Sequence, residues 1–412
     1  MLGKISLIQV NKFKAKYYDL IVLGAGIVGL SIARQKFLNE PDCKILIIEK
    51  ESTVGMHASG RNSGVLHSGI YYPSDTLKAK LCSDGSKLMS DYCREHGLPI
   101  VECGKVILPS NYEDEKQIRV LYDRGVSNGA LVKVISKDEL KEIEPEANSN
   151  INKALYSPKT SVVDPFSILN KIRLDLIKSG ADICYNEFVI QADSDRSLIK
   201  TNKKSIFSYS HLVNCTGQYS DKVAQLFDVG SQYTLLPFKG FYYGLRRQSN
   251  IKFNGLIYPV PDLKMPFLGV HSVKSTNGEI YFGPTAMPAF GRENYKGIEG
   301  VSFNDSISIS YHLIRQYINN KQGFRNYANQ EAAMLIKSNF LNNIQNLIPN
   351  LSNEDLILSS KVGIRAQLLN KKTDKLEMDF LVESVDNTTH ILNAVSPAFT
   401  SAFSFAKYIL NK

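Results

Sequence analysis

Three glycines spaced Gly24-x-Gly26-x-x-Gly29 follow an apolar run, and this spacing is typical of a phosphate-binding turn. The first glycine permits a sharp turn, the second lets the backbone approach a pyrophosphate, and the third lets helix and strand pack closely. The amide groups at the helix start and the helix dipole then favour the anion. A second apolar run ends at Glu49, whose carboxylate can bond ribose hydroxyls. The pattern predicts an adenine dinucleotide, and the acid favours NAD or FAD over NADP.

The elements that must position this loop alternate between strands and helices. Apolar strands are expected at 18–23 and 44–49 with a helix between them. A third apolar strand at 211–217 leads into an amphipathic helix at 220–227. The chain ends with a strand at 390–394, a turn through Ser396 and Pro397, and a helix over 398–410, in which Pro397 suits the first turn. This alternation predicts an α/β sheet.

The middle of the chain has a different pattern. Short apolar runs joined by glycine and proline turns predict an antiparallel sheet, with strands at 238–245, 256–260, 267–273 and 279–282. Helical periodicity is expected at 76–96, 114–128, 303–319 and 330–346.

Two interleaved domains are therefore predicted. The dinucleotide-binding domain comprises residues 17–78, 155–228 and 358–412, and the substrate domain comprises 79–154 and 229–357; residues 1–16 form a basic tail. Interleaving favours a flavoprotein over a two-domain NAD dehydrogenase, in which the nucleotide domain is usually one block.

Composition excludes several classes of protein. The chain has 412 residues, 43% hydrophobic and 22% charged, as is ordinary for a globular protein. We find no apolar run long enough to span a membrane. The net charge of +9 is spread over scattered lysines, such as the pairs 203–204 and 371–372 at expected hairpin tips, so nucleic-acid binding is not expected. The six cysteines include no CxxC pair, which favours a reduced, cytoplasmic compartment and predicts no metal site.

Beyond the glycine loop, several motifs resemble the L-2-hydroxyglutarate dehydrogenase/oxidase family of the FAD-dependent D-amino-acid-oxidase superfamily. The resemblance runs from about Tyr17 to the C-terminus and rests on the segments 57–73, 237–240, 256–261, 265–271, 363–367 and 393–401. Two positions depart from the family, which usually has a histidine in place of Arg61 and an arginine in place of Lys239.

The resemblance implies FAD as cofactor and a Rossmann-like FAD-binding domain of the glutathione-reductase type. It implies oxidation of L-2-hydroxyglutarate to 2-oxoglutarate, with a hydride passing to flavin N5. The residues implied to contact the cofactor are Gly24, Gly26, Gly29, Glu49, Lys50, Ser59, Asn62, Ser63, Gly64, Val65, Thr216, Gly217, Ser396, Pro397 and Thr400.

Such a reaction needs a base near neutral pKa and cations for two carboxylates. His271 is the first candidate for the base and His67 the second. Arg365 is the candidate for the α-carboxylate because its planar fork matches a carboxylate, and Lys239 is the candidate for the distal one. Tyr258 and Tyr72 are candidates for added hydrogen bonds.

Alternatives stay open at this stage. The substrate can be an amino acid or another 2-hydroxy acid, and the electron acceptor can be oxygen or a membrane quinone. Peripheral attachment to the inner membrane is one alternative to a purely cytoplasmic location. A flavoprotein that binds RNA is disfavoured, because no basic cluster interleaved with aromatics is present.

Overall fold

A sheet of parallel strands at one end of the molecule carries the glycine loop. The computed structural model describes residues 15–263 and 265–411, so most of the predicted tail lies outside the described residues. The parallel strands run in the order β21 (Thr388–Asn393), β12 (Ile206–Asn214), β1 (Lys16–Leu23), β2 (Ile45–Ile48) and β9 (Asp182–Cys184). Antiparallel strands β10 (Val189–Asp193), β11 (Leu198–Thr201) and β20 (Leu381–Val385) extend it. The α/β prediction is confirmed.

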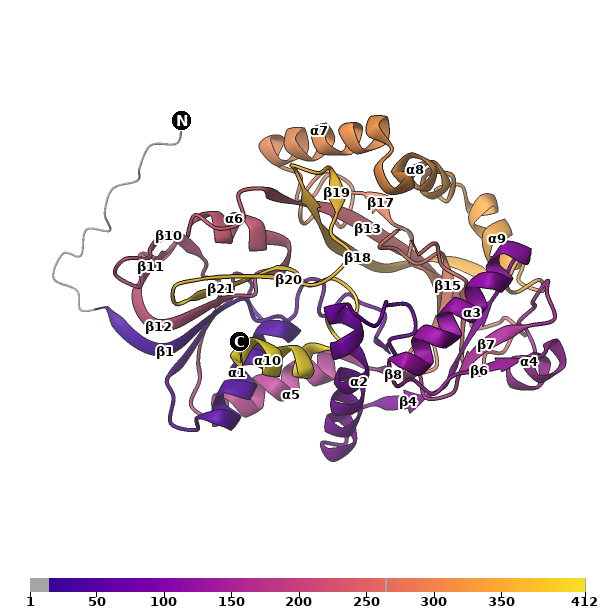
Figure 1. The fold of residues 1–412 in the computed structure, drawn as a ribbon, viewed down its shortest axis with the longest axis horizontal. Coiled ribbons are helices and arrows are strands. Elements are labelled where there is room, and N and C mark those ends of the chain that lie inside the picture. Colours follow the sequence, from indigo (N-terminus) through magenta and orange to yellow (C-terminus); the bar gives the residue numbers. More distant parts are fainter. Residues whose placement is uncertain (1–14, 264, 412) are drawn as a thin grey trace.

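Helices cover one face of this sheet. Helix α1 (Ile27–Asn39) packs against α5 (Pro165–Lys178) and α10 (Ala402–Leu410), and α2 (Leu77–Glu95) packs against α10 (Figure 1). All four residues of β2 are buried, as expected for a parallel strand covered on both faces. Leu20 and Val22 of β1 join the helix-side core, and Ile21 and Leu23 join a second core on the other face.

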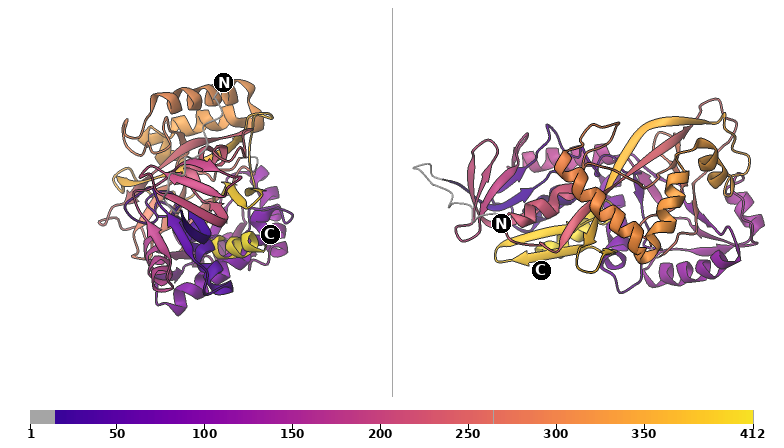
Figure 2. Two further views of the ribbon diagram at one scale, coloured as in Figure 1. Left: turned by 90° about the vertical axis from the view of Figure 1, so that its left-hand side faces the viewer. Right: turned by 90° about the horizontal axis from the view of Figure 1, so that it is seen from above.

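The other half of the molecule is built on two long antiparallel strands, β13 (Tyr233–Leu245) and β18 (Leu356–Asn370). They form a six-stranded sheet with β15 (His271–Lys274), β16 (Ile280–Gly283), β17 (Met287–Pro288) and β19 (Lys375–Leu376). Helices α7 (Phe303–Asn319) and α8 (Phe324–Ala333) lie over this sheet, and α9 (Lys337–Gln345) continues along its side (Figures 1 and 2).

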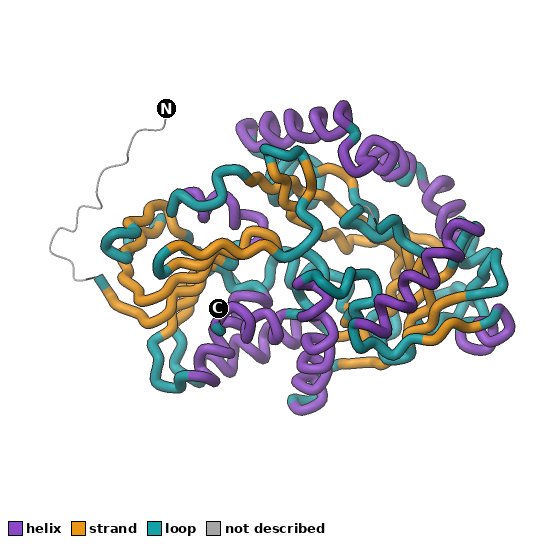
Figure 3. Tube along the Cα trace, in the orientation of Figure 1, coloured by secondary structure: helices purple, strands orange, loops and turns teal. Residues whose placement is uncertain are grey.

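Two smaller sheets complete the substrate side. One has the order β14 (Leu256–Pro259), β5 (Lys105–Leu108), β7 (Ala154–Ser157) and β6 (Lys133–Ile135), and the other the order β3 (Val65–Leu66), β8 (Ser161–Val163) and β4 (Ile100–Glu102). Helices α3 (Tyr112–Ser127) and α4 (Lys137–Ile143) lie beside them, and α6 (Ser220–Gln225) follows the 3-10 turn Gly217–Tyr219. A second 3-10 turn, Lys321–Gly323, precedes α8. Loops from both halves meet in the middle of the molecule (Figure 3).

Several predicted elements differ from the structure. The run at 256–260 pairs in parallel with β5 and is outside the long antiparallel sheet. The strand expected from 267 begins only at His271, after a segment that contains Pro266 and Gly269.

Two predicted helices also differ. The helix expected at 330–346 is divided between α8 and α9, because Phe324 of α8 packs in one core while Phe340 and Ile344 of α9 pack in another. The last helix begins at Ala402, so Pro397 lies in the preceding turn and not in the helix.

Sheet membership also bears on the domain boundaries. The predicted boundaries at 155 and 358 each divide a strand, β7 and β18. Both strands pair with neighbours on the substrate side, so we propose placing these two boundaries outside the strands. The lysine pairs at 203–204 and 371–372 lie in the turns between antiparallel strands, as predicted. All six cysteines are free thiols.

Candidate active site

A single continuous cavity of about 1160 Å³ runs between the two halves. It exceeds the usual range for a pocket that binds one small molecule, about 300–1,000 Å³. Its walls come from the glycine loop, the loop at 55–65, the turn at 215–219, strands β13 and β18, and the turn at 394–400.

One end of this cavity is suited to a pyrophosphate. Gly24 has a φ of +100°, and a Cβ there would lie 2.7 Å from the Cys215 carbonyl oxygen. A Cβ on Gly29 would lie 2.1 Å from the Gly24 carbonyl oxygen, so only glycine allows this approach of helix and strand. Gly26 caps α1 without a side chain, and the first turn holds no acid. The helix start therefore opens into the cavity as an anion site.

Glu49 lies at the carboxyl end of β2, where the structure fixes its carboxylate. Oε2 accepts a hydrogen bond from the Ala25 amide at 2.7 Å, and Oε1 accepts one from the Glu51 amide at 2.9 Å. The side chain lines the cavity and each oxygen keeps a lone pair, as ribose binding requires. Beside it, Lys50 Nζ lies 2.5 Å from Glu293 Oε1 and also bonds Glu51. The ammonium group therefore offsets part of the negative charge of these two carboxylates, which cluster with His57.

Most other predicted cofactor residues also line the cavity: Lys50, Ser59, Asn62, Ser63, Val65, Thr216, Gly217, Ser396, Pro397 and Thr400. Ser59 Oγ accepts the Ile27 amide at 2.9 Å, and Thr400 Oγ1 accepts the His67 amide at 3.1 Å. Gly64 does not line the cavity, and its contact with the cofactor stays a prediction. Its φ is +73°, and a Cβ there would lie 2.4 Å from the Val163 carbonyl oxygen, which explains why glycine stands at this position. Gly29 does not line the cavity either, and its lack of a side chain allows α1 to pack against the turn at Gly24.

His271 has the geometry of a base. Its side chain is 4% exposed and lines the cavity. Nδ1 lies 2.6 Å from the Gly269 carbonyl oxygen, which requires Nδ1 to carry the proton and leaves Nε2 as the acceptor. The ring stacks on Tyr258 with centroids 3.9 Å apart. Burial disfavours the imidazolium ion and lowers the pKa of His271 to about 3, which is below the near-neutral value expected from the sequence. The ring is therefore neutral at pH 7 and able to accept a proton.

The remaining predicted substrate residues gather at the same end of the cavity, with one exception. His67 is buried with its pKa lowered to about 3, and its Nε2 lies 3.4 Å from Ser396 Oγ. Arg365 donates from Nη1 to the Thr285 carbonyl oxygen at 3.2 Å, which orients the guanidinium and leaves other donors of its fork for a carboxylate. Tyr258 and Tyr72 line the cavity, and burial raises the pKa of both phenols.

Lys239 is the exception, and its role as a substrate anchor stays a prediction that its position does not support. It does not line the cavity, whereas its neighbour Gly240 does, because successive residues of β13 face opposite sides of the sheet. Its Nζ lies 3.4 Å from Asn294 Oδ1.

Lys239→Met is therefore expected to leave kcat and KM within about twofold of the wild-type values, as is usual for substitutions away from a site. Steady-state kinetics with the substrate of this protein checks this. A tenfold or larger rise in KM would indicate that Lys239 contributes to substrate binding.

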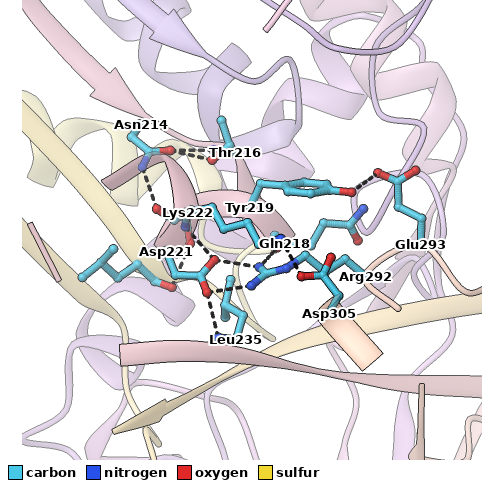
Figure 4. Close-up of polar contacts among 12 residues, drawn as sticks. Asn214, Thr216, Gln218, Tyr219, Asp221, Lys222, Leu235, Arg292, Glu293 and Asp305 are labelled. Atoms are coloured by element: carbon cyan, nitrogen blue, oxygen red, sulfur yellow. Dashed lines mark hydrogen bonds and ion pairs between the residues drawn. The ribbon is translucent and has the colours of Figure 1, made fainter. Parts of the chain in front are cut away.

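A polar network behind the cavity holds the turn at Gly217–Tyr219 in place (Figure 4). The buried Arg292 guanidinium pairs with both carboxylate oxygens of Asp221, at 2.7 and 2.8 Å, and also bonds the Gln218 carbonyl oxygen. Asp221 Oδ2 accepts the Leu235 amide at 3.0 Å. The bidentate pair therefore ties the turn to the start of β13.

Arg292→Met is expected to lower the free energy of unfolding by about 3–5 kcal/mol, because it leaves the Asp221 carboxylate buried without its cation. Denaturant unfolding of the purified protein measures this. The matched control is Lys153→Met, which breaks an exposed pair with Glu115 at 2.6 Å and should cost at most about 1 kcal/mol. Equal costs for the two variants would contradict the account.

The sequence reasoning missed several residues at the reactive end. Tyr71 and Lys78 line the cavity, and Lys105 lies directly behind Tyr71 and Tyr258. Lys105 opens an apolar strand after Cys103 and Gly104, which gave no signal that its side chain faces a site. Arg61, noted as a departure from the family, lines the cavity with its guanidinium over the Tyr295 ring at 4.2 Å.

Comparison with known proteins decides the family. The model of the FAD dependent oxidoreductase family (DAO) matches residues 19–411. The chain belongs to this family of FAD-dependent oxidoreductases. FAD is therefore its cofactor. The start of α1, where Gly26 brings no side chain, and the fixed carboxylate of Glu49 fit that cofactor's pyrophosphate and ribose.

Relatives of this FAD-dependent oxidoreductase include several L-2-hydroxyglutarate dehydrogenases. The protein of that name from Escherichia coli K12 is 33% identical over 398 residues, covering 96% of this chain and 93% of its own. The one from Indibacter alkaliphilus is 35% identical over 398 residues, covering 94% and 96%. The human mitochondrial one is 32% identical over 416 residues, covering 96% and 88%.

Solved structures show the same fold. The L-α-glycerophosphate oxidase of Mycoplasma pneumoniae with FAD bound superposes with a TM-score of 0.76 at 21% identity, covering 96% of this chain and 94% of its own. Glycine oxidase from Geobacillus kaustophilus gives 0.70 at 16% identity, covering 96% and 94%. The predicted combination of an FAD-binding parallel sheet and an antiparallel substrate sheet is confirmed.

Proposed function

We propose that this FAD-dependent oxidoreductase oxidises L-2-hydroxyglutarate to 2-oxoglutarate. The observation that carries the proposal is the pairing of a neutral imidazole, with Nε2 as acceptor, and an arginine fork at one end of the FAD cavity. The names of the relatives from Escherichia coli, Indibacter alkaliphilus and human support this substrate.

Each residue has a defined part in this chemistry. FAD, when bound, supplies an acceptor for the hydride that leaves the carbon bearing the hydroxyl. His271 Nε2 takes the hydroxyl proton, while the Nδ1–H bond to the Gly269 carbonyl oxygen and the stacked Tyr258 ring hold the imidazole in place. Arg365 binds the α-carboxylate and sets which face of the carbon is presented.

The low pKa of His271 predicts how kcat depends on pH. Only the neutral imidazole can accept the proton, and burial keeps the pKa at about 3, well below that of a free imidazole. Activity is lost when pH falls through the pKa, so kcat is expected to stay constant from about pH 7 down to about pH 5. A pH–rate profile measures this. Loss of activity with a single pKa between about 6 and 7 would contradict it.

Oxidation of an amino acid or of another 2-hydroxy acid is the alternative substrate assignment. Amine oxidation needs no base for a hydroxyl proton, so the orientation of His271 would then have no catalytic purpose. The geometry of His271 therefore favours a hydroxy acid.

The acceptor and the membrane contact remain predictions. Among the described residues, no helix combines the length and apolar character needed to cross a bilayer. Helix α7 carries exposed apolar side chains three or four residues apart, which favours the predicted peripheral contact and a quinone over oxygen. They are Phe303, Ile307, Tyr311, Ile314 and Ile318.

A turnover screen tests the proposed function. The FAD-loaded protein is incubated with a dye acceptor and with one candidate substrate at a time. The candidates are the two enantiomers of 2-hydroxyglutarate, followed by lactate, glycerol 3-phosphate, glycine and proline. We expect turnover with L-2-hydroxyglutarate and formation of 2-oxoglutarate, identified by mass. Turnover with an amino acid and none with either 2-hydroxyglutarate enantiomer would overturn the proposal.

A further inference from the structure

Lys105 is a buried cation for which the described residues provide no counter-charge within hydrogen-bonding reach. Its side chain is 1% exposed, and its Nζ has no hydrogen-bond partner among them. Nζ lies over two aromatic rings, 4.7 Å from the centroid of Tyr71 and 5.2 Å from that of Tyr258. Burying an ammonium group without a carboxylate is costly, so its presence calls for a functional explanation.

The surroundings of Lys105 hold other polar atoms without partners. The hydroxyl groups of Tyr71 and Tyr258 and the Nδ1 of His67 are buried and make no hydrogen bond with the described residues. All three of these side chains line the cavity, at the end where His271 lies. Buried polar groups without hydrogen-bond partners, next to a positive charge without a counter-charge, are features of an anion-binding site.

The proposed substrate, on which this inference rests, has two carboxylates, and Arg365 accounts for one. Neither Lys239 nor Lys105 lines the cavity itself, but Lys105 Nζ lies over the rings of Tyr71 and Tyr258, which do. Lys239 Nζ instead lies beside Asn294, so the distal carboxylate needs another cation. We propose that Lys105 is a specificity-determining residue, whose fixed positive charge behind Tyr71 and Tyr258 selects substrates with a second carboxylate. The two phenol hydroxyls donate to that carboxylate, and Lys105 attracts it from behind their rings.

Lys78 is the other buried lysine near this end, and its setting is different. It lines the cavity, with Nζ 5.8 Å from the Tyr72 ring centroid. Burial lowers the pKa of Lys78, and the nearby Asp379 carboxylate acts in the opposite direction by favouring the ammonium form. Asp379 also accepts the Leu77 and Lys78 amides at the start of α2, at 2.7 and 2.9 Å. The Asp379 carboxylate therefore offsets part of the Lys78 charge, whereas no carboxylate among the described residues does so for Lys105.

The test compares two unreactive ligands that differ only in the distal group. Glutarate and pentanoate are titrated into FAD-loaded protein, and binding is followed by the change in the flavin absorption spectrum. In Lys105→Met the Kd for glutarate should rise about 10- to 100-fold, as for loss of a buried charge contact, while the Kd for pentanoate changes by less than about threefold. Lys239→Met is the matched control and should change neither.

Thermal unfolding separates this role from a structural one. Methionine fills the same volume without a buried charge, so Lys105→Met should unfold at the same temperature as the wild type or higher. Burial lowers the pKa of Lys105 to about 8, and that of Lys78, which lines the cavity, to about 8 as well. Affinity for glutarate should therefore fall above pH 8 in both proteins, and the fall should be smaller in Lys105→Met than in the wild type.

Two results would overturn the inference. One is an equal rise in the Kd for glutarate and for pentanoate in Lys105→Met. The other is a rise in the Kd for glutarate alone in Lys78→Met, with no such rise in Lys105→Met. Failure of the proposed function is distinguishable from this. A protein that binds glutarate through Lys105 and forms no 2-oxoglutarate from L-2-hydroxyglutarate refutes the proposed reaction and leaves the dicarboxylate site. Turnover together with a glutarate affinity independent of Lys105 refutes this inference alone.

Discussion

Replacing His271 with asparagine is expected to lower kcat about 10²- to 10⁴-fold, the usual contribution of a positioned base. The imidazole Nε2 is the proton acceptor that the Nδ1–H bond to the Gly269 carbonyl oxygen leaves free. Asparagine keeps a donor for that carbonyl but places no basic nitrogen at the position of Nε2. Steady-state kinetics with L-2-hydroxyglutarate and a dye acceptor measures the loss.

The control for this variant is His96→Asn, at the C-terminal end of α2, which should retain wild-type kcat. His67→Asn discriminates between the two candidate bases. A larger loss in His67→Asn than in His271→Asn would assign the base to His67. Loss of bound FAD in His271→Asn, measured by the flavin content of the purified protein, would show a structural role.

Replacing Arg365 with lysine is expected to raise KM about 100-fold or more, even though the charge is kept. The guanidinium is oriented by its bond to the Thr285 carbonyl oxygen, and its planar fork can bind a carboxylate through two parallel hydrogen bonds. A lysine at this place offers a point charge with no such geometry. Because a misplaced substrate also reacts slowly, kcat should fall together with the rise in KM.

The check on Arg365→Lys is the Kd for glutarate and the Kd for pentanoate, followed by the flavin absorption spectrum. Both ligands carry the carboxylate assigned to Arg365, so both Kd values should rise to a similar degree. This separates Arg365 from Lys105, whose replacement should affect the diacid alone. A loss confined to the diacid in Arg365→Lys would place the distal carboxylate at Arg365 and contradict the assignment.

The FAD-binding half could be predicted from sequence because its signals are local. The turn conformation of Gly24, the packing of Gly29 against it and the position of Glu49 follow from one strand, one turn and one helix. Helix α7 was predicted with its observed bounds, since its apolar periodicity is uninterrupted.

The substrate end could be predicted only in part because it depends on pairing between distant strands. The face of β13 that Lys239 occupies follows from its register with β18, which alternation alone does not reveal. Lys105 reaches the tyrosines because β5 pairs in parallel with β14, and a parallel pairing of these two runs was not expected. In both cases the residue type gave the chemistry, and the tertiary structure determined which lysine lies against the tyrosines of the cavity wall.

Anaerobic mixing of the FAD-loaded protein with one equivalent of each enantiomer of 2-hydroxyglutarate tests the central claim most directly. We expect the L enantiomer to bleach the flavin's visible absorption in a single turnover and to release one equivalent of 2-oxoglutarate, while the D enantiomer leaves the spectrum oxidised. Full bleaching by the D enantiomer, or none by either, would contradict the account.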